Sequence, residues 1–332
     1  MRLPDPALPL DAGRAGEAFD LMLSGALGEG EIAAFLLALA ERGETPAEIA
    51  AAAGAMRERM IGLVAPDGAI DVVGTGGDGA HTVNISTAVA FVVAACGVPV
   101  AKHGNRAASS LSGATDVLAA LGWQADLPLD RLEACIADSG IVFLHAARHH
   151  PALAQVAAVR RALGRRTIFN LLGPLANPAR VTRQMIGVYA AEWVRPMAEA
   201  AHALGSTDAL VVHGSGLDEI AVHGPSALAW MHGGVVREIV LDPARHGLGG
   251  HALDALRGGT PQENAAALTL LFAGGRDTAQ LRAYRDAVVL NAAAALKLAK
   301  AADGWDAGIR MAGDALDSGA AKDRLARFID FR

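Results

Sequence analysis

Three groups of residues in this chain have types and spacing suited to binding a phosphorylated ligand. The first is the glycine loop Gly74–Gly79, which directly follows an apolar run and precedes a predicted helix. Glycines there let backbone N–H groups approach an anion closely, and the N-terminus of the following helix favours negative charge. The stretch His81–Thr87 adds hydroxyl and amide side chains at that helix start, more of them than one helix cap needs. We therefore expect a phosphate site here.

The same loop allows two other interpretations. Gly74, Gly76 and Gly79 match the G-x-G-x-x-G pattern of dinucleotide-binding folds. That fold also needs an acidic residue about 20 positions further on to hold a ribose hydroxyl. The next predicted strand ends instead in Lys102-His103, the wrong charge for that task. A tight turn without a ligand is the second alternative, and we favour the phosphate interpretation over both.

The second group, Lys102–Ser110, lies at the carboxyl end of the next predicted strand, where open α/β sheets present their ligands. A lysine, a histidine, an asparagine, an arginine and two serines surround Gly104 and form a dense set of donors for phosphate and ribose oxygens. Taken alone, Lys102 could be a solvated surface charge and His103 a hydrogen-bonded core group. Together with the glycine loop they favour a binding site.

The third group is the adjacent acidic pair Asp218-Glu219, which follows a predicted strand and the turn 213–216. Carboxylates beside a polyphosphate site typically hold Mg²⁺, a hard cation bound by few carboxylates plus substrate oxygens. An exposed, solvated acidic pair is the alternative.

The elements that must position these groups form two units. Residues 16–63 carry apolar side chains at helical spacing, with Thr45, Pro46 and Glu48 predicting the start of a third helix. From residue 69 onward short β-branched runs alternate with helical segments, which predicts a mostly parallel central sheet with crossover helices. The predicted strands are 70–73, 98–100, 141–144, 186–189, 209–212 and 238–241. We expect a small all-helical N-terminal domain at 1–67, with a return of helices at about 151–180, and a larger α/β domain at 68–332.

The composition excludes several classes of protein. The chain has 332 residues, 52% of them hydrophobic, and its longest apolar run, 88–101, is shorter than the roughly 20 residues that cross a bilayer. A net charge of −6 gives no electrostatic basis for binding nucleic acid. Cys96 and Cys135 lack the spacing of a disulfide framework or a zinc site. The N-terminus has no export signal, so we expect a cytoplasmic protein without nucleic-acid or membrane partners.

The apolar positions of residues 18–39 are dense for so short a helical unit. They predict that this unit packs against something besides itself, and a second copy of the chain is the simplest candidate.

In their order along the chain, these motifs resemble the anthranilate phosphoribosyltransferase family. The resemblance spans about residues 18–298 and is carried by Gly74–Asp78, Asn84-x-Ser86-Thr87, Lys102–Arg106, His150-Pro151, Arg160, Phe169-Asn170, Gly173-Pro174-Leu175, Asn177-Pro178 and Asp218-Glu219. It implies transfer of the phosphoribosyl group from phosphoribosyl pyrophosphate to the amine of anthranilate, a step of tryptophan biosynthesis. It also implies a small helical domain beside a larger α/β domain, and a homodimer through the helical part.

The resemblance further implies roles for individual residues. Phosphoribosyl pyrophosphate is expected to contact Gly74, Gly77, Asp78, Thr82, Asn84, Ile85, Ser86, Thr87, Lys102, His103, Gly104, Asn105, Arg106, Ala107, Ala108, Ser109, Ser110 and Ala114. Anthranilate is expected to contact Gly74, Asn105, His150, Arg160 and Pro174, with Arg160 receiving its carboxylate. Mg²⁺ is expected at Ser86, Asp218 and Glu219, and the catalytic residues are expected to be Lys102, Asn105, Asp218 and Glu219. Departures from the family pattern occur at His149, Leu111 and Ala114.

The implied reaction places its chemical demand on the leaving group. An aromatic amine is neutral at pH 7 and needs no strong base, whereas breaking the C1–O bond of the ribose requires charge stabilisation and positioning. One alternative is a pyrimidine nucleoside phosphorylase, which resembles this architecture but leaves Asp218-Glu219 and Arg160 without a role. The other is a non-catalytic, nucleic-acid-binding relative, which should be basic across one face.

Overall fold

A single central sheet organises the computed structural model, which describes residues 3–104, 112–124 and 127–331. Within these ranges seven strands pair in the order β3-β2-β1-β4-β5-β6-β7. Their bounds are β1 (Ile70–Gly74), β2 (Val100–Gly104), β3 (Ile141–His145), β4 (Arg183–Gly187), β5 (Asp208–His213), β6 (Ser226–His232) and β7 (Val235–Leu241). The first five run parallel, and β6 and β7 add an antiparallel hairpin at one edge. The predicted mostly parallel sheet is confirmed.

Strand β6 is the one strand among these that the sequence reading missed. It joins β7 through the two-residue turn Gly233-Gly234, in which both glycines have positive φ values of 56° and 82°. Such a two-glycine turn matches the right-handed twist of a hairpin. The Gly-Gly pair beside the predicted strand at 238–241 was therefore a usable signal for a hairpin.

Fourteen α-helices and four short 3₁₀ helices lie in the described ranges. The α-helices are α1 (Ala12–Leu23), α2 (Glu29–Arg42), α3 (Pro46–Glu58), α4 (Ile85–Ala95), α5 (Ala114–Ala120), α6 (Leu129–Ser139), α7 (Ala146–His149), α8 (Ala154–Leu163), α9 (Phe169–Leu175), α10 (Val194–Ala203), α11 (Pro261–Phe272), α12 (Ala279–Leu298), α13 (Trp305–Asp317) and α14 (Ala320–Asp330). The 3₁₀ helices are η1 (Pro151–Leu153), η2 (Ala191–Trp193), η3 (Pro243–His246) and η4 (Leu253–Leu256). None of these helices is long and apolar enough to span a membrane.

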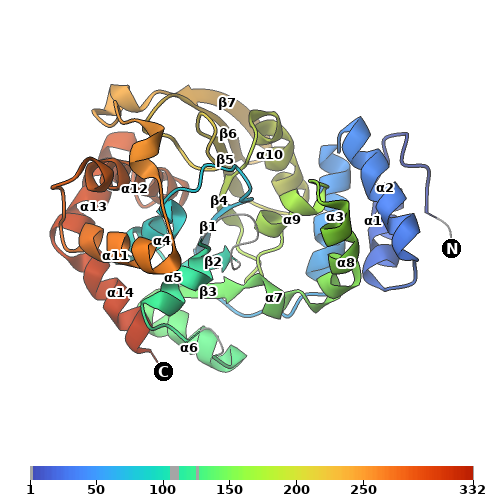
Figure 1. The fold of residues 1–332 in the computed structure, drawn as a ribbon, viewed down its shortest axis with the longest axis horizontal. Helices are drawn as coiled ribbons and strands as arrows, with labels where there is room; N and C mark the ends of the chain where they lie inside the picture. Colours follow the sequence, from blue (N-terminus) through green and yellow to red (C-terminus); the bar gives the residue numbers. More distant parts are fainter. Residues whose placement is uncertain (1–2, 105–111, 125–126, 332) are drawn as a thin grey trace.

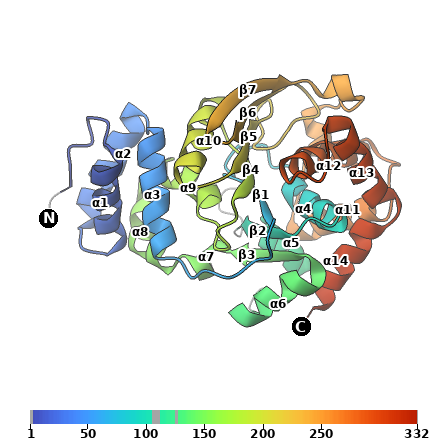
Figure 2. The same cartoon turned by 180° about the vertical axis from the view of Figure 1, so that it is seen from behind.

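The helices divide into two groups around the sheet. Helices α1–α3 form a lobe to one side, and α8 returns from the middle of the chain to pack on α1 and α2 (Figure 1). Helix α9 packs on α3 and on β2, so it lies between this lobe and the sheet. On the opposite face α4, α12, α13 and α14 stack together, as the reverse view shows (Figure 2).

Capping interactions fix the start of the third helix where the sequence predicted it. Thr45 Oγ1 accepts from the N–H of Glu48 at 3.3 Å, and Glu48 Oε2 accepts from the N–H of Thr45 at 2.8 Å. Glu48 is fully buried, and its second oxygen accepts from Arg42 at 2.6 Å and from the N–H of Leu10 at 2.9 Å. These bonds satisfy a buried carboxylate and tie the segment before α1 to α3.

The apolar stripes of α1 and α2 are buried within this chain. Phe19, Met22 and Leu36 are 0% exposed and share one core with residues of α8, α9 and α10. The rings of Phe19 and Phe169 meet edge to face at 6.2 Å. The expectation that these stripes pack against something besides themselves was right, but much of that surface is covered by later helices of the same chain. Their density therefore no longer argues for a second copy.

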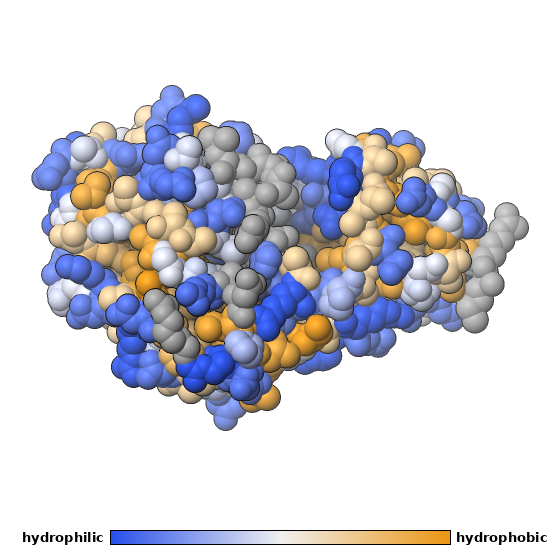
Figure 3. Space-filling model, turned by 60° about the horizontal axis from the view of Figure 1, so that its bottom comes forward, coloured by the Kyte–Doolittle hydropathy of each residue, from blue (hydrophilic) through white to orange (hydrophobic). Residues whose placement is uncertain are grey.

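The face drawn in Figure 3 carries a mixture of hydrophilic and hydrophobic residues, and the small helical lobe projects there beside the larger lobe. Both cysteines are free, as expected from their spacing.

Candidate active site

The sheet order places a ligand-binding position at the carboxyl end of β1. Strand β1 pairs with β2 on one side and with β4 on the other, so the chain connections leave it in opposite directions. Open α/β sheets bind ligands in the crevice at such a switch point, outside the carboxyl ends of the strands. The last residues of β1 and β4, Gly74 and Gly187, are register partners there.

These two glycines make room for the acidic pair. A Cβ atom on Gly187 would lie 1.5 Å from the carbonyl oxygen of Asp218, and one on Gly74 would lie 2.2 Å from its Oδ2. A Cβ on Gly214 would similarly meet the carbonyl oxygen of Glu219 at 2.2 Å. A side chain at Gly187 or Gly214 would require backbone of the Asp218-Glu219 loop to move, and one at Gly74 would displace the Asp218 carboxylate, so the three glycines form a notch that seats the pair. We call Gly74, Gly187 and Gly214 the glycine notch.

The acidic pair is bonded into the other two motifs. Asp218 Oδ2 accepts from the N–H of Gly76 at 2.7 Å, and Glu219 Oε1 accepts from the N–H of Ser86 at 3.0 Å. Ser86 lies in the first turn of α4, where a carboxylate is favoured by the helix dipole. Both residues are partly buried, so the alternative of an exposed, solvated pair is wrong.

Burial, reinforced by neighbouring carboxylates, sets the electrostatics of this loop. Burial raises the pKa of Asp218 to about 7, and the carboxylate of Asp78 contributes to the rise. Burial, together with the charge of Asp218, raises the pKa of Glu219 to about 8. Burial also lowers the pKa of the Lys102 ammonium, while the neighbouring carboxylates act in the opposite direction. The site therefore favours a bound cation, which would lower the pKa of both carboxyls.

The glycine loop has the backbone that a close approach to an anion requires. Gly76 and Gly77 have φ values of 66° and 77°, in the left-handed region that favours glycine. Asp78 Oδ1 accepts from the N–H of Ala80 at 3.0 Å and closes the turn that follows. The loop contacts the acidic pair directly, because the N–H of Gly76 donates to Asp218.

At the start of α4 the side chains do more than cap the helix. Asn84 is the N-cap residue, yet its side chain makes no cap hydrogen bond. Its Oδ1 accepts from Asn264 of α11 at 2.8 Å, and its Nδ2 donates to the carbonyl of Ser112 at 3.4 Å. The alternative of a simple cap is therefore wrong for Asn84. It links α11 to Ser112, two residues before α5 begins.

Three other residues expected to contact the phosphorylated substrate lie near the start of α4. Ile85 and Thr87 are 2% and 1% exposed, so their side chains belong to the core. Thr82 forms an antiparallel bridge with Arg257, which places the loop beside the segment before α11.

Strand β2 sends its two polar residues to opposite faces, as successive residues of a strand must. Lys102 is 3% exposed, and its Nζ donates to the carbonyl of Val72 and to Ser86 Oγ, the latter at 3.1 Å. The alternative of a solvated surface lysine is wrong. On the other face, the ring Nδ1 of His103 lies 2.9 Å from the carbonyl of Gly173, and the ring centroid lies 5.1 Å from that of His150.

The histidines on that second face are neutral. Burial lowers the pKa of His103 to about 3 and that of His150 to about 4. Nδ1 of His103 lies at hydrogen-bonding distance from a carbonyl, and its buried Nε2 has no partner among the residues that the structure describes. A neutral imidazole of this kind can orient an aromatic ligand without adding charge.

Helices α8 and α9 supply the remaining residues expected to bind anthranilate. The Arg160 guanidinium lies 5.5 Å above the ring of Phe169, the first residue of α9. Pro174 is buried in the same helix, next to the Gly173 carbonyl that meets His103. This arrangement gathers Arg160, Pro174, His103 and His150 along α9.

His149, which departs from the family pattern, is fully buried, and its Nδ1 lies 2.6 Å from the carbonyl of Ile61. It thereby holds the segment between α3 and β1. Gly104 ends β2 and Ala114 opens α5. The other expected contacts of this region lie outside the described residues: Asn105, Arg106, Ala107, Ala108, Ser109 and Ser110, together with Leu111.

Several residues that shape the site were missed by the sequence reading. They are Gly187, Gly214, Asn264, Tyr284 and Asn291. Gly187 was open to discovery, because a glycine at the carboxyl end of a predicted strand resembles Gly74. The buried asparagines and the tyrosine gave no local signal, because their partners lie 71 to 200 positions away in the chain.

The donor set at the acidic pair suits a hard cation better than a soft one. Among the described residues no group of three or more His, Cys, Asp or Glu side chains is arranged to hold a metal by itself. The available donors are the carboxylates of Asp218 and Glu219 and the hydroxyl of Ser86. Mg²⁺ is typically held by one or two carboxylates plus substrate phosphates, so these residues fit such a shared site.

Comparisons with known proteins agree with this geometry. Residues 67–322 match the family described as "Glycosyl transferase family, a/b domain", and residues 8–60 match "Glycosyl transferase family, helical bundle domain". The chain is 52% identical to the anthranilate phosphoribosyltransferase of Parvibaculum lavamentivorans over 96% of this chain and 93% of that one. It is 54% identical to that of Rhodospirillum rubrum over 97% and 91%.

Two solved structures extend the comparison to the fold. Anthranilate phosphoribosyltransferase from Thermus thermophilus superposes with a TM-score of 0.92 at 42% identity, covering 98% of this chain and 96% of that one. The enzyme from Saccharomyces cerevisiae, solved in complex with phosphoribosyl pyrophosphate and Mg, superposes with a TM-score of 0.87 at 29% identity, covering 97% and 93%. With its two lobes, its switch-point loops and these near-full-length identities, the chain belongs to the anthranilate phosphoribosyltransferase family.

Proposed function

We propose that this chain transfers the phosphoribosyl group of phosphoribosyl pyrophosphate to the amine of anthranilate. The products are N-(5-phosphoribosyl)anthranilate and pyrophosphate, a step of tryptophan biosynthesis. The observation that carries the proposal is the seating of Asp218-Glu219 against the glycine loop and the start of α4. That contact joins a metal-binding pair to two phosphate-binding motifs at one switch point of the sheet.

The phosphoribosyl pyrophosphate side of the site lies on the α4 face of β2. Backbone N–H groups of the loop Gly74–Asp78 and of the stretch Asn84–Thr87, other than those of Gly76 and Ser86 that donate to the acidic pair, bind the phosphates, aided by the dipole of α4. Lys102, held at the Ser86 hydroxyl, places a positive charge where negative charge grows on the leaving pyrophosphate. The segment Asn105–Ser110 and Ala114 complete the contacts implied by the family.

Asp218, Glu219 and Ser86 would hold Mg²⁺ with oxygen atoms of the substrate. When bound, Mg²⁺ neutralises pyrophosphate charge and so favours departure of the leaving group. The solved complex of the yeast relative contains both Mg and phosphoribosyl pyrophosphate, which supports this assignment. The residues themselves contribute preorganisation, because the glycine notch fixes the loop before any ligand arrives.

Anthranilate binds on the other face of β2, along α9. The Arg160 guanidinium receives its carboxylate, and His150, Pro174, Gly74 and Asn105 contact the ring and the amine. A guanidinium matches a planar carboxylate with two parallel hydrogen bonds, which orients the amine toward the ribose C1. Both partners are then held in one geometry, and the reaction needs positioning more than a base.

The two alternatives are less well supported. A pyrimidine nucleoside phosphorylase uses free phosphate and gives no role to the acidic pair that the glycine notch seats. A nucleic-acid-binding relative should be basic, whereas the chain carries a net charge of −6. A single assay separates all three: loss of anthranilate fluorescence on addition of phosphoribosyl pyrophosphate and Mg²⁺. Phosphorolysis of a pyrimidine nucleoside, or nucleic-acid binding without this loss, would refute the proposal.

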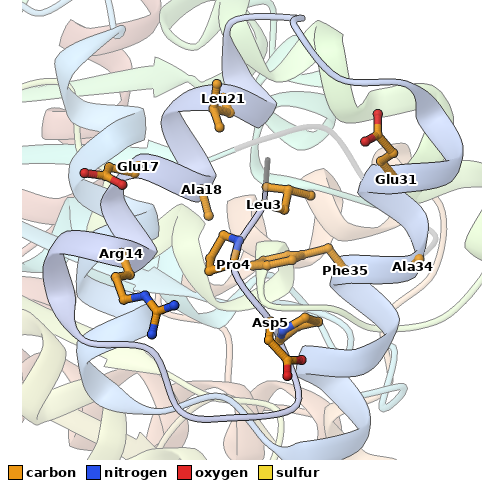
Figure 4. Close-up of a pocket in the computed structure, with 11 residues that line it drawn as sticks. Leu3, Pro4, Asp5, Arg14, Glu17, Ala18, Leu21, Glu31, Ala34 and Phe35 are labelled. Carbon is orange, nitrogen blue, oxygen red and sulfur yellow. The ribbon is translucent and has the colours of Figure 1, made fainter. Parts of the chain in front are cut away.

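We also propose a homodimer through the helical lobe. A hollow of about 880 Å³ opens on the outer side of α1 and α2, and Leu3, Pro4, Leu21 and Phe35 lie on its walls (Figure 4). Partly apolar hollows of this kind suit a second copy of the chain. Light scattering at micromolar concentration tests the dimer.

The matched variants are Leu21→Glu inside the hollow and Leu8→Glu outside it, where Leu8 is already 63% exposed. Only Leu21→Glu should yield monomers. A wild-type monomer at this concentration would refute the dimer.

We also propose the division into a helical domain at 1–67, with helices returning at about 151–180, and an α/β domain at 68–332. The cytoplasmic location stays a prediction.

A further inference from the structure

Helix α12 carries two buried polar side chains that the proposed reaction does not use. Tyr284 and Asn291 are both 0% exposed. They lie seven positions apart, close to two helical turns, so they share one face and are separated by about 10 Å along the axis. Helix α12 packs beside α4, and both views show the two helices side by side (Figures 1 and 2).

Asn291 holds the residue that follows the acidic pair. Its Oδ1 accepts from the N–H of Ile220 at 2.9 Å, and its Nδ2 donates to the carbonyl of Ile220 at 2.9 Å. The same Nδ2 also donates to the carbonyl of Ala287 within α12 at 2.9 Å. The carboxamide thus pairs with both backbone groups of Ile220, which fixes the position and the orientation of the peptide next to Glu219.

Tyr284 holds the start of the phosphate-binding helix. Its hydroxyl donates to the carbonyl of Asn84 at 3.1 Å. That carbonyl also accepts from the N–H of Ala88 at 3.2 Å, as the first hydrogen bond of α4. The tyrosine is therefore an additional donor that the helix itself does not need. Burial, with a contribution from the charge of Glu219, raises the pKa of Tyr284, so the hydroxyl remains a donor.

Ile220 and Asn84, the two residues held by α12, lie on either side of the hydrogen bond that joins the acidic loop to the start of α4. Glu219, next to Ile220, accepts from the N–H of Ser86, two positions after Asn84. A rigid helix that holds both sides of this contact fixes the distance between the acidic pair and the phosphate-binding stretch. That distance decides whether one Mg²⁺ can contact the protein carboxylates and the substrate oxygens together.

We propose that Asn291 and Tyr284 are positioning residues through which α12 sets the spacing between the acidic loop and the phosphate-binding loop. The proposal rests on the proposed function, because it assigns the two residues to the site for Mg²⁺ and phosphoribosyl pyrophosphate. Neither side chain contacts a substrate. Their effect is on the binding of one substrate and its metal, and anthranilate binding on the opposite face of β2 is independent of them.

The test compares Tyr284→Phe and Asn291→Leu with wild type and with Ser139→Ala. Ser139 is the matched control: it is 0% exposed, and its Oγ lies within hydrogen-bonding distance of the carbonyls of Cys135 and Ile141, outside both loops. Calorimetry measures binding of phosphoribosyl pyrophosphate in the presence of Mg²⁺. Steady-state assays give the Mg²⁺ concentration for half-maximal rate and both Michaelis constants.

Loss of a residue that orients metal ligands typically weakens metal binding or activity about 10- to 100-fold. We expect Asn291→Leu to raise the dissociation constant for phosphoribosyl pyrophosphate and the Mg²⁺ requirement within that range. Tyr284→Phe should shift both in the same direction by a smaller factor, because it removes a single hydrogen bond. The Michaelis constant for anthranilate should stay at the wild-type value in both, and Ser139→Ala should change none of these quantities.

Equal changes for both substrates, or changes that Ser139→Ala reproduces, would show a merely structural role and overturn the inference. If Asn291→Leu does not fold, Tyr284→Phe decides alone, because it keeps the ring and leaves the Asn84 carbonyl bonded within α4. The two proposals fail separately. Wild-type protein that transfers no phosphoribosyl group refutes the proposed function, whereas an active wild type with unaltered variants refutes only the role of α12.

Discussion

The glycine notch makes Gly187→Ala a severe test of the proposed site. The new Cβ would lie 1.5 Å from the carbonyl oxygen and 2.4 Å from the carbonyl carbon of Asp218. Ordinary contact requires more than 3 Å, so the acidic loop must retreat by about 2 Å. These are backbone atoms, and no side-chain rotation relieves the clash.

A shift of this size breaks the contacts that define the site. The bond from Gly76 to Asp218 is 2.7 Å and the bond from Ser86 to Glu219 is 3.0 Å, so neither survives. Misplacement of a catalytic group by 1 Å can cost about 100-fold in rate, and we expect turnover of Gly187→Ala to fall by at least about that factor. Overpacking should also lower the free energy of unfolding by about 1–3 kcal/mol.

The assay follows loss of anthranilate fluorescence at saturating phosphoribosyl pyrophosphate, with thermal unfolding measured on the same samples. Gly304→Ala is the matched control, because a Cβ at Gly304 meets nothing within 4 Å and its φ of −172° suits any residue. That variant should keep wild-type turnover. A folded Gly187→Ala protein with wild-type turnover and Mg²⁺ dependence would refute the reasoning that the notch seats the catalytic carboxylates.

Three further predictions concern the acidic pair and the arginine. Arg160→Ala should raise the Michaelis constant for anthranilate about tenfold or more, because it removes a charged hydrogen bond, and should leave the Michaelis constant for phosphoribosyl pyrophosphate nearly unchanged. Equal effects on both constants would contradict the assignment of Arg160 to the anthranilate carboxylate. Asp218→Asn with Glu219→Gln should lower turnover about 100-fold or more and raise the optimum Mg²⁺ concentration, measured by metal titration. Wild-type behaviour would show that the pair does not hold the metal. Because the pKa values of Asp218 and Glu219 are raised to about 7 and 8, the ligand-free site holds protons at neutral pH. Binding of Mg²⁺ with phosphoribosyl pyrophosphate should therefore release protons, and the affinity should increase as the pH rises from about 6 to 9. Calorimetry in buffers of different ionisation enthalpy would detect the release. The double variant should lose the part of this release that comes from the protein.

Local patterns predicted the parts of the fold that depend on near neighbours. The capping box of Thr45 and Glu48, the parallel strands and the glycine loop all follow from residues within a few positions of one another. The interpretation of Lys102 as a solvated surface charge failed for the opposite reason. Its burial depends on Val72 and Ser86, which reach it only after β1, α4 and β2 have assembled.

The same distinction separates the recognisable motifs from the residues that position them. A glycine loop or an acidic pair is recognisable because the residues that give it its chemistry are adjacent in the sequence. Gly187 and Asn291 matter only because the acidic loop folds back onto β4 and α12, and a glycine after a strand or an asparagine in an apolar helix has many other uses.

In the proposed site, strand β2 would let one short sequence serve both substrates. Lys102 and His103 are adjacent in the chain, and the alternation of a strand sends the lysine toward Ser86 of α4 and the histidine toward Gly173 of α9. The charges follow this division. In the proposed site, the phosphate side holds the buried lysine and the acidic pair, whereas burial keeps His103 and His150 neutral on the proposed anthranilate side, so these two imidazoles add no positive charge beside the Arg160 guanidinium. A one-residue slip of β2 would exchange the two faces, and for that reason the proposed site depends on the register of β2 against β1 and β3.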